Sequence, residues 1–115
     1  MNLFIWYPKC STCQMALKAL ESKNVLVEKR NIKEEKPTYE ELKMWVSRYH
    51  IPLKKLFNTS GNVYKELHLK DKLESMTDDE KLKLLSTNGM LVKRPLLIMP
   101  DKMIIGYDRK EYESL

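Results

Sequence analysis

The stretch that decides the fold runs from Leu3 to Cys13 and reads Leu-Phe-Ile-Trp-Tyr-Pro-Lys-Cys-Ser-Thr-Cys. Residues 3–7 are apolar without alternation and include aromatic and β-branched side chains, which is typical of a central strand buried on both faces. Pro8 ends that strand. Apolar residues then recur at positions 13, 16, 17 and 20, the spacing of one helical stripe. The stretch therefore predicts a buried strand leading into an amphipathic helix.

The segment after this helix predicts a second strand. Asn24 is suited to end the helix in the left-handed conformation. Residues 25–32 then have the composition of a strand whose second half is charged. Strand, helix and strand within about 30 residues favour a parallel pair joined by a right-handed crossover.

The middle of the chain, residues 37–90, is predicted to be helical. Two capping boxes mark helix starts, Thr38 with Glu41 and Thr77 with Glu80. Residues 51–52 and 88–89 are helix stops, and short helical turns are predicted at residues 53–57 and 63–67.

The last third returns to strands. Residues 96–99 and 103–105 predict two strands joined by a turn, and Asp108 and Glu111 are candidate caps of a final short helix. The order is β-α-β, a helical insertion, then β-β-α. We therefore expect an α/β fold with a four-stranded mixed sheet, in a single domain spanning residues 1–115.

Composition and charge exclude several classes of protein. The chain has 115 residues, 43% of them hydrophobic, and no apolar run long enough to span a bilayer. We expect a cytoplasmic protein without a membrane partner. The net charge is +5, but acidic residues alternate with basic ones and no basic run exceeds two residues. This favours a solvated mixed surface over direct nucleic-acid binding.

The strongest chemical motif is the pair Cys10 and Cys13, the only cysteines of the chain. Their spacing places both sulfurs on one side of a helical turn. Cys10 lies at the predicted helix start, where free backbone N–H groups favour a thiolate, and Cys13 is suited to be a resolving thiol. In the alternative interpretation, Cys10 is incidental and Cys13 is a small core residue. A C-x-x-C pair beside a βαβ unit favours redox chemistry.

A zinc site is the competing chemical interpretation. His50 and His68 complete a set of four possible ligands with the cysteines, but 17 residues separate the two histidines. This exceeds the usual short ligand spacing, so we expect no metal.

A second motif is Lys93-Arg94-Pro95 directly before the third strand. A proline that enters a strand can sit at a tight bend, and a cis bond is one solution. If Arg94 lies opposite Cys10, its guanidinium can bind an anion over the thiolate; otherwise it is a surface arginine.

Three segments together, residues 7–13, 57–61 and 93–96 with a later Gly106-Tyr107, resemble the arsenate-reductase-like branch of the thioredoxin fold. That branch includes glutaredoxin-coupled arsenate reductases and transcription regulators of the Spx and MgsR type. The resemblance implies that Cys10 is the nucleophile, that Arg94 binds an oxyanion and that Pro95 is a cis-proline. We also expect Ser11 and Thr12 to contact the substrate.

The resemblance does not extend to all of the arginines of arsenate reductases. Of three arginines around the thiolate, the second would fall at Ser60 and the third near Gly106-Tyr107, so only Arg94 is retained. The C-x-x-C pair is usual in Spx-like members. We also expect the chain to end soon after its final helix, without the C-terminal extension of such regulators.

Two functions follow from the resemblance. The first is a thiol-dependent oxidoreductase without a bound cofactor, recycled by glutathione, another low-molecular-weight thiol, thioredoxin or glutaredoxin. The second is a regulator in which a Cys10–Cys13 disulfide switches binding to RNA polymerase. A third interpretation, a structural domain that merely tolerates its thiols, needs nothing beyond packing.

Overall fold

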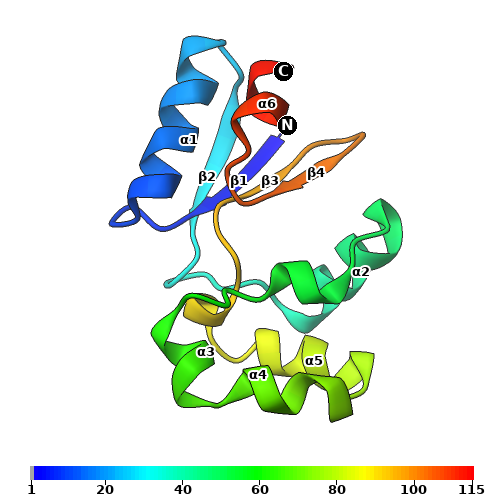
Figure 1. The fold of residues 1–115 in the computed structure, drawn as a ribbon. Coiled ribbons are helices and arrows are strands. Elements are labelled where there is room, and N and C mark those ends of the chain that lie inside the picture. The colour runs from blue at the N-terminus through cyan, green and yellow to red at the C-terminus, as the bar shows by residue number, and fades with distance from the viewer. Residues whose placement is uncertain (1) are drawn as a thin grey trace. The chain divides into compact units, whose positions relative to one another are not determined.

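The fold was obtained as a computed structural model that describes residues 2–115 (Figure 1). The strands are β1 (Asn2–Trp6), β2 (Val27–Asn31), β3 (Leu96–Ile98) and β4 (Met103–Ile105). The α-helices are α1 (Ser11–Ser22), α2 (Tyr39–Tyr49), α3 (Asn62–Glu66), α4 (Leu69–Lys72), α5 (Asp78–Leu85) and α6 (Arg109–Glu113). Three 3₁₀ turns accompany them, η1 (Leu53–Leu56), η2 (Leu73–Ser75) and η3 (Gly89–Leu91).

The four strands form one mixed sheet in the order β2-β1-β3-β4. β1 runs parallel to β2 and antiparallel to β3, and β3 runs antiparallel to β4. Phe4 and Ile5 are neighbours in β1 and point to opposite faces, and both are fully buried. The predicted central strand and α/β mixed sheet are therefore confirmed.

One face of the sheet carries a core that joins the two ends of the chain. Its members are at most 1% exposed and come from β1, α1, β3, β4 and α6: Phe4, Ala16, Leu20, Leu97, Ile104 and Tyr112. Because α1 and α6 both contribute to this cluster, they cover the same face (Figure 1). The first helix is thereby fixed against the sheet.

Several boundaries differ from those predicted. The second strand begins at Val27 rather than residue 25, because the N–H of Val25 donates to the carbonyl of Leu20 and still belongs to the helix end. Asn24 adopts a positive φ of 57° there, as predicted. The third strand ends at Ile98, because the N–H of Met99 closes the following turn onto Lys102.

The chain divides into two compact units, one made of Met1–Ile32 and Arg94–Leu115 and the other of Lys33–Lys93. The second unit is the predicted helical insertion, with wider bounds than the expected 37–90. Both predicted capping boxes are present, at Thr38 and at Thr77. That the whole chain behaves as one domain stays a prediction.

The end of α5 differs from the prediction in one respect. Residues 88–89 were expected to stop a helix, but α5 already ends at Leu85. The side chain of Asn88 instead accepts a hydrogen bond from the N–H of Met90 at 2.8 Å and caps η3. Asparagine is equally suited to cap the start of a helical turn and to follow its end, which explains the difference.

No helix within residues 2–115 combines the length and apolar character that crossing a membrane requires.

Candidate functional site

Cys10 occupies the N-cap of α1, between the end of β1 and the first helical turn. Its own N–H donates to the carbonyl of Tyr7 at 2.9 Å, which fixes the loop between strand and helix. Its backbone is extended, with φ of −93° and ψ of 121°, and its side chain is half-buried. The thiol therefore lies at the helix end where backbone N–H groups have no carbonyl partners within the helix.

Cys13 lies one turn further along α1 and is fully buried. The N–H of Tyr7 donates to its Sγ at 3.4 Å, so the sulfur has a backbone donor from the end of β1. Both cysteines are free thiols in this structure. The predicted juxtaposition of the two residues at the start of α1 is therefore present.

The environment of Cys10 favours its thiolate. Burial raises the pKa of the Cys10 thiol, but other interactions outweigh it and leave the pKa below its ordinary value. These are the backbone N–H and the thiol of Cys13, the backbone N–H of Thr12, and the positive charge of Arg94. The position at a helix start, where backbone N–H groups face the sulfur, favours its charged form, as the sequence predicts for Cys10.

The environment of Cys13 instead favours its protonated thiol. Burial is the largest influence and raises the pKa of its thiol to about 12, with further increases from the neighbouring Cys10. The N–H of Tyr7 and the charge of Arg94 lower it, but by less. The Cys13 thiol therefore keeps its proton.

Arg94 and Pro95 directly precede β3 in the chain and belong to the same unit as the two cysteines. The charge of Arg94 acts on both thiols, and its Cζ lies 5.6 Å from the centre of the Tyr7 ring. The bond between Arg94 and Pro95 is cis, as predicted. The carbonyl of Pro95 accepts a hydrogen bond from Gly106 at 2.8 Å, and Gly106 has a φ of 76°, a conformation that favours glycine.

The other predicted substrate-contacting residues are exposed. Ser11 and Thr12 form the first turn of α1 with their side chains in solvent. The backbone N–H of Thr12 acts on Cys10, and contact of either hydroxyl with a substrate stays a prediction.

Two residues of the site were not identified by sequence reasoning. Tyr7, which the sequence predicts only as the end of the buried strand, supplies the N–H that donates to Cys13 and the ring beside Arg94. Tyr112 of α6 is 1% exposed, packs edge-on against Tyr107 and interacts electrostatically with Cys13. Burial raises the pKa of the Tyr112 hydroxyl. No local signal could have found Tyr112, because only the fold brings α6 onto α1.

The two histidines of the competing zinc interpretation belong to a different unit from the cysteines. His50 and His68 are exposed residues at helix ends in the second unit, both with φ near 54°. Within residues 2–115 no three His, Cys, Asp or Glu side chains gather closely enough to hold a metal ion.

Comparison with known proteins places this site in a family. The model of the ArsC family matches residues 5–115. The chain is 46% identical to the uncharacterized protein YusI of Bacillus subtilis over 111 residues, which cover 96% of this chain and 94% of YusI. It is 32% identical to the regulatory protein MgsR of the same organism over 112 residues, 97% of this chain and 87% of MgsR.

A solved structure agrees with these sequence relatives. The crystal structure of an ArsC family related protein from Bacteroides fragilis is 49% identical and superposes with a TM-score of 0.94, covering 98% of this chain and 95% of that one. The mixed four-stranded sheet with its helices is common to these proteins, which confirms the predicted thioredoxin-like fold. The chain therefore belongs to the ArsC family.

Proposed function

We propose that this chain is a thiol–disulfide redox protein in which Cys10 is the attacking thiolate and Cys13 the resolving thiol. The observation that carries the proposal is that the pKa values of the two thiols are shifted in opposite directions. Cys10 has a lowered pKa at a helix start, and Cys13 beside it is buried and protonated. Such a pair separates the two roles that thiol–disulfide exchange requires.

The reaction proceeds in two exchanges. The Cys10 thiolate attacks one sulfur of a substrate disulfide, forms a mixed disulfide and releases the other sulfur as a thiolate. Cys13 then attacks the Sγ of Cys10, releases the remaining substrate thiolate and passes its own proton to that leaving group. The substrate gains two electrons and Cys10 and Cys13 form a disulfide.

A thiol reductant restores the dithiol by the same chemistry in reverse. Glutathione, another low-molecular-weight thiol, thioredoxin or glutaredoxin can supply the two electrons, and no bound cofactor is required. Arg94 is proposed to hold a negative group near Cys10, with the exposed hydroxyls of Ser11 and Thr12 as further contacts. Its charge already acts on the Cys10 sulfur, which supports this assignment.

The test uses the reduced protein and a small chromogenic aromatic disulfide. The wild type is expected to release the coloured thiol and form the Cys10–Cys13 disulfide, whereas Cys10→Ser is expected to release none. Cys13→Ser retains the attacking thiolate, and a stable mixed disulfide detectable by mass spectrometry is expected. Equal release by the wild type and Cys10→Ser would contradict the proposal.

A second candidate function is a redox-switched regulator that binds RNA polymerase. The 32% identity with the regulatory protein MgsR along nearly the whole chain favours it. In this function the Cys10–Cys13 disulfide changes affinity for polymerase instead of serving turnover. A pull-down with purified polymerase distinguishes the two. Binding that differs between reduced and oxidised protein supports regulation, and absence of binding in both states argues against it.

A further inference from the structure

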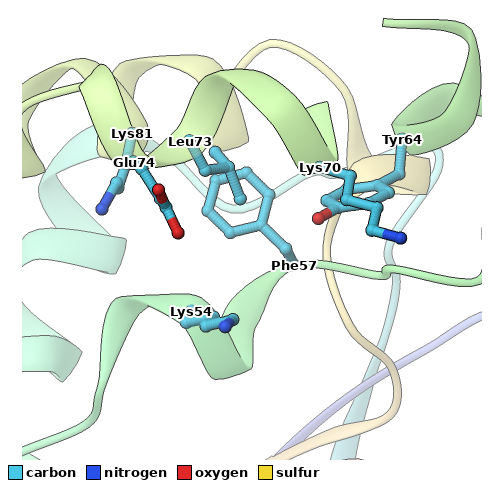
Figure 2. Close-up of a pocket in the computed structure, with 7 residues that line it drawn as sticks. All are labelled: Lys54, Phe57, Tyr64, Lys70, Leu73, Glu74 and Lys81. Atoms are coloured by element: carbon cyan, nitrogen blue, oxygen red, sulfur yellow. The ribbon is translucent and has the colours of Figure 1, made fainter. Parts of the chain in front are cut away.

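The helical unit Lys33–Lys93 contains a pocket of about 190 Å³ that the thiol chemistry does not use. Figure 2 shows the ring of Phe57 in its middle, with Leu73 beside it and Tyr64 further along. These three side chains are 2%, 8% and 9% exposed, so they form a packed apolar floor. The rings of Phe57 and Tyr64 meet edge to face at 6.4 Å.

The backbone under this floor is held on both sides of Phe57. The N–H of Lys93 donates to the carbonyl of Leu56 at 2.7 Å, and the N–H of Asn58 donates to that of Leu91 at 2.8 Å. Phe57 itself forms an isolated antiparallel bridge with Val92. The floor is therefore preformed, and an occupant does not have to order it.

The rim of the pocket is basic. It is lined by Lys54, Lys70 and Lys81, which come from η1, α4 and α5, and by one acid, Glu74 (Figure 2). Within residues 2–115 none of these three lysines takes part in an ion pair, whereas Lys83 is held by Asp79 at 3.0 Å. Their positive charges are therefore available to an occupant.

Two further hollows adjoin the pocket and extend this chemistry. The first has a volume of about 320 Å³; Tyr64 and Lys70 line both it and the pocket, and Lys65 lines it in addition. The second has a volume of about 470 Å³; Phe57 and Lys54 line both it and the pocket, and Lys55 and Lys93 line it in addition. The surface is thus one apolar pocket with a border in which six lysines outnumber two acids, Glu74 and Asp71. We name the three hollows together the lysine-rimmed groove.

We propose that the lysine-rimmed groove binds an acidic peptide segment of a partner protein, which inserts one large apolar side chain between Phe57, Leu73 and Tyr64. The central pocket is smaller than the roughly 300–1,000 Å³ typical of sites for small molecules, but it suits a single phenylalanine or leucine anchor. The surrounding lysines complement Asp or Glu residues on either side of that anchor. This inference goes beyond the proposed redox function and does not depend on the cysteines.

The probe is a fluorescein-labelled peptide of glutamates with one central phenylalanine, and the readout is fluorescence anisotropy with the full chain. Two further peptides serve as controls, one with serine in place of the phenylalanine and one with lysines in place of the glutamates. Loss of the apolar anchor is expected to weaken binding about tenfold or more. The lysine peptide is expected not to bind.

The protein variants change only the rim, so the fold is kept. Lys54→Gln with Lys81→Gln is expected to weaken binding of the acidic peptide about three- to tenfold. The charge-matched control, Lys18→Gln with Lys23→Gln, alters exposed lysines of α1 and its end in the other unit and is expected to change binding by less than about twofold. Circular dichroism checks that each variant is folded.

Four results would overturn the proposal. They are equal binding of the phenylalanine and serine peptides, equal weakening by the two double variants, binding of phenylacetate as tight as that of the peptide, and tighter binding of single-stranded RNA. The first two would indicate a nonspecific charge effect, the third a small-molecule site, and the fourth a nucleic-acid surface. None of these measurements involves Cys10, so failure here is distinguishable from failure of the redox proposal.

Discussion

At the scale of single residues, Cys10 and Cys13 show how position decides chemistry. Both are cysteines of the same helix, yet the pKa of one thiol is lowered and that of the other is raised to about 12. The sequence predicted the first because a helix start is recognisable from Pro8 and the apolar stripe. The second depends on the depth of burial of Cys13, which only packing against the sheet determines.

The lowered pKa of Cys10 predicts how its alkylation depends on pH. Cys13 is fully buried and its thiol stays protonated, so iodoacetamide is expected to report Cys10 alone. The rate is expected to rise with a midpoint below that of free cysteine measured under the same conditions, because the thiolate is the nucleophile and the pKa of Cys10 is lowered. A midpoint at or above that of free cysteine would contradict a lowered pKa of the Cys10 thiol.

Replacing Arg94 tests one contribution to that pKa. Arg94→Met keeps a long side chain at this position but removes a positive charge that stabilises the Cys10 thiolate. The alkylation midpoint is therefore expected to move to higher pH. Lys18→Met removes a charge from the exposed side of α1 and serves as the control, with no such movement expected.

Tyr112 gives a prediction about stability at the same scale. Its hydroxyl is buried and has no hydrogen-bond partner within residues 2–115, although its ring is part of the core. Tyr112→Phe keeps the ring and removes the unsatisfied group, so the free energy of unfolding in urea is expected to rise by about 1 kcal/mol. A clear loss of stability would show that the hydroxyl is paired.

At the scale of elements, the capping boxes carry a separate prediction. Thr38 and Thr77 each accept a hydrogen bond from the third helical residue at 3.1 Å, and the glutamate there binds back to the threonine N–H. Thr77→Ala removes the cap of α5 and is expected to lower the free energy of unfolding by about 1 kcal/mol. Thr77→Ser keeps the hydroxyl and is expected to restore most of it; a loss as large as that of alanine would contradict this.

The elements that a sequence can predict are those that depend on residues close together in the chain. Both threonine caps, the central strand and the left-handed turn at Asn24 were predictable, because each depends on residues within a few positions of one another. Helix α4 and the 3₁₀ turn η2, at 69–75, were not predicted, because their apolar residues Leu69 and Leu73 are too few to define a period. Tertiary packing of those two leucines completes that segment.

At the scale of the whole molecule, the chain forms two compact units joined by covalent crossings. The chain passes between them twice, after Ile32 and before Arg94, so the insertion is tied at both ends to the unit that carries the cysteines. Arg94 directly follows the second crossing and acts on both thiols.

This connection leads us to expect one cooperative unfolding transition, as is usual for chains below about 150 residues. Leu85 is fully buried in α5, and Leu85→Ala is expected to cost about 2–5 kcal/mol through the cavity it leaves. In a cooperative molecule, hydrogen–deuterium exchange of the most protected amides accelerates by the same factor in β1 as in α5. Faster exchange confined to Lys33–Lys93 would instead show two domains that unfold separately. In that case the pH midpoint of Cys10 alkylation is expected to be the same in Leu85→Ala as in the wild type, because the unit that contains the thiols remains folded.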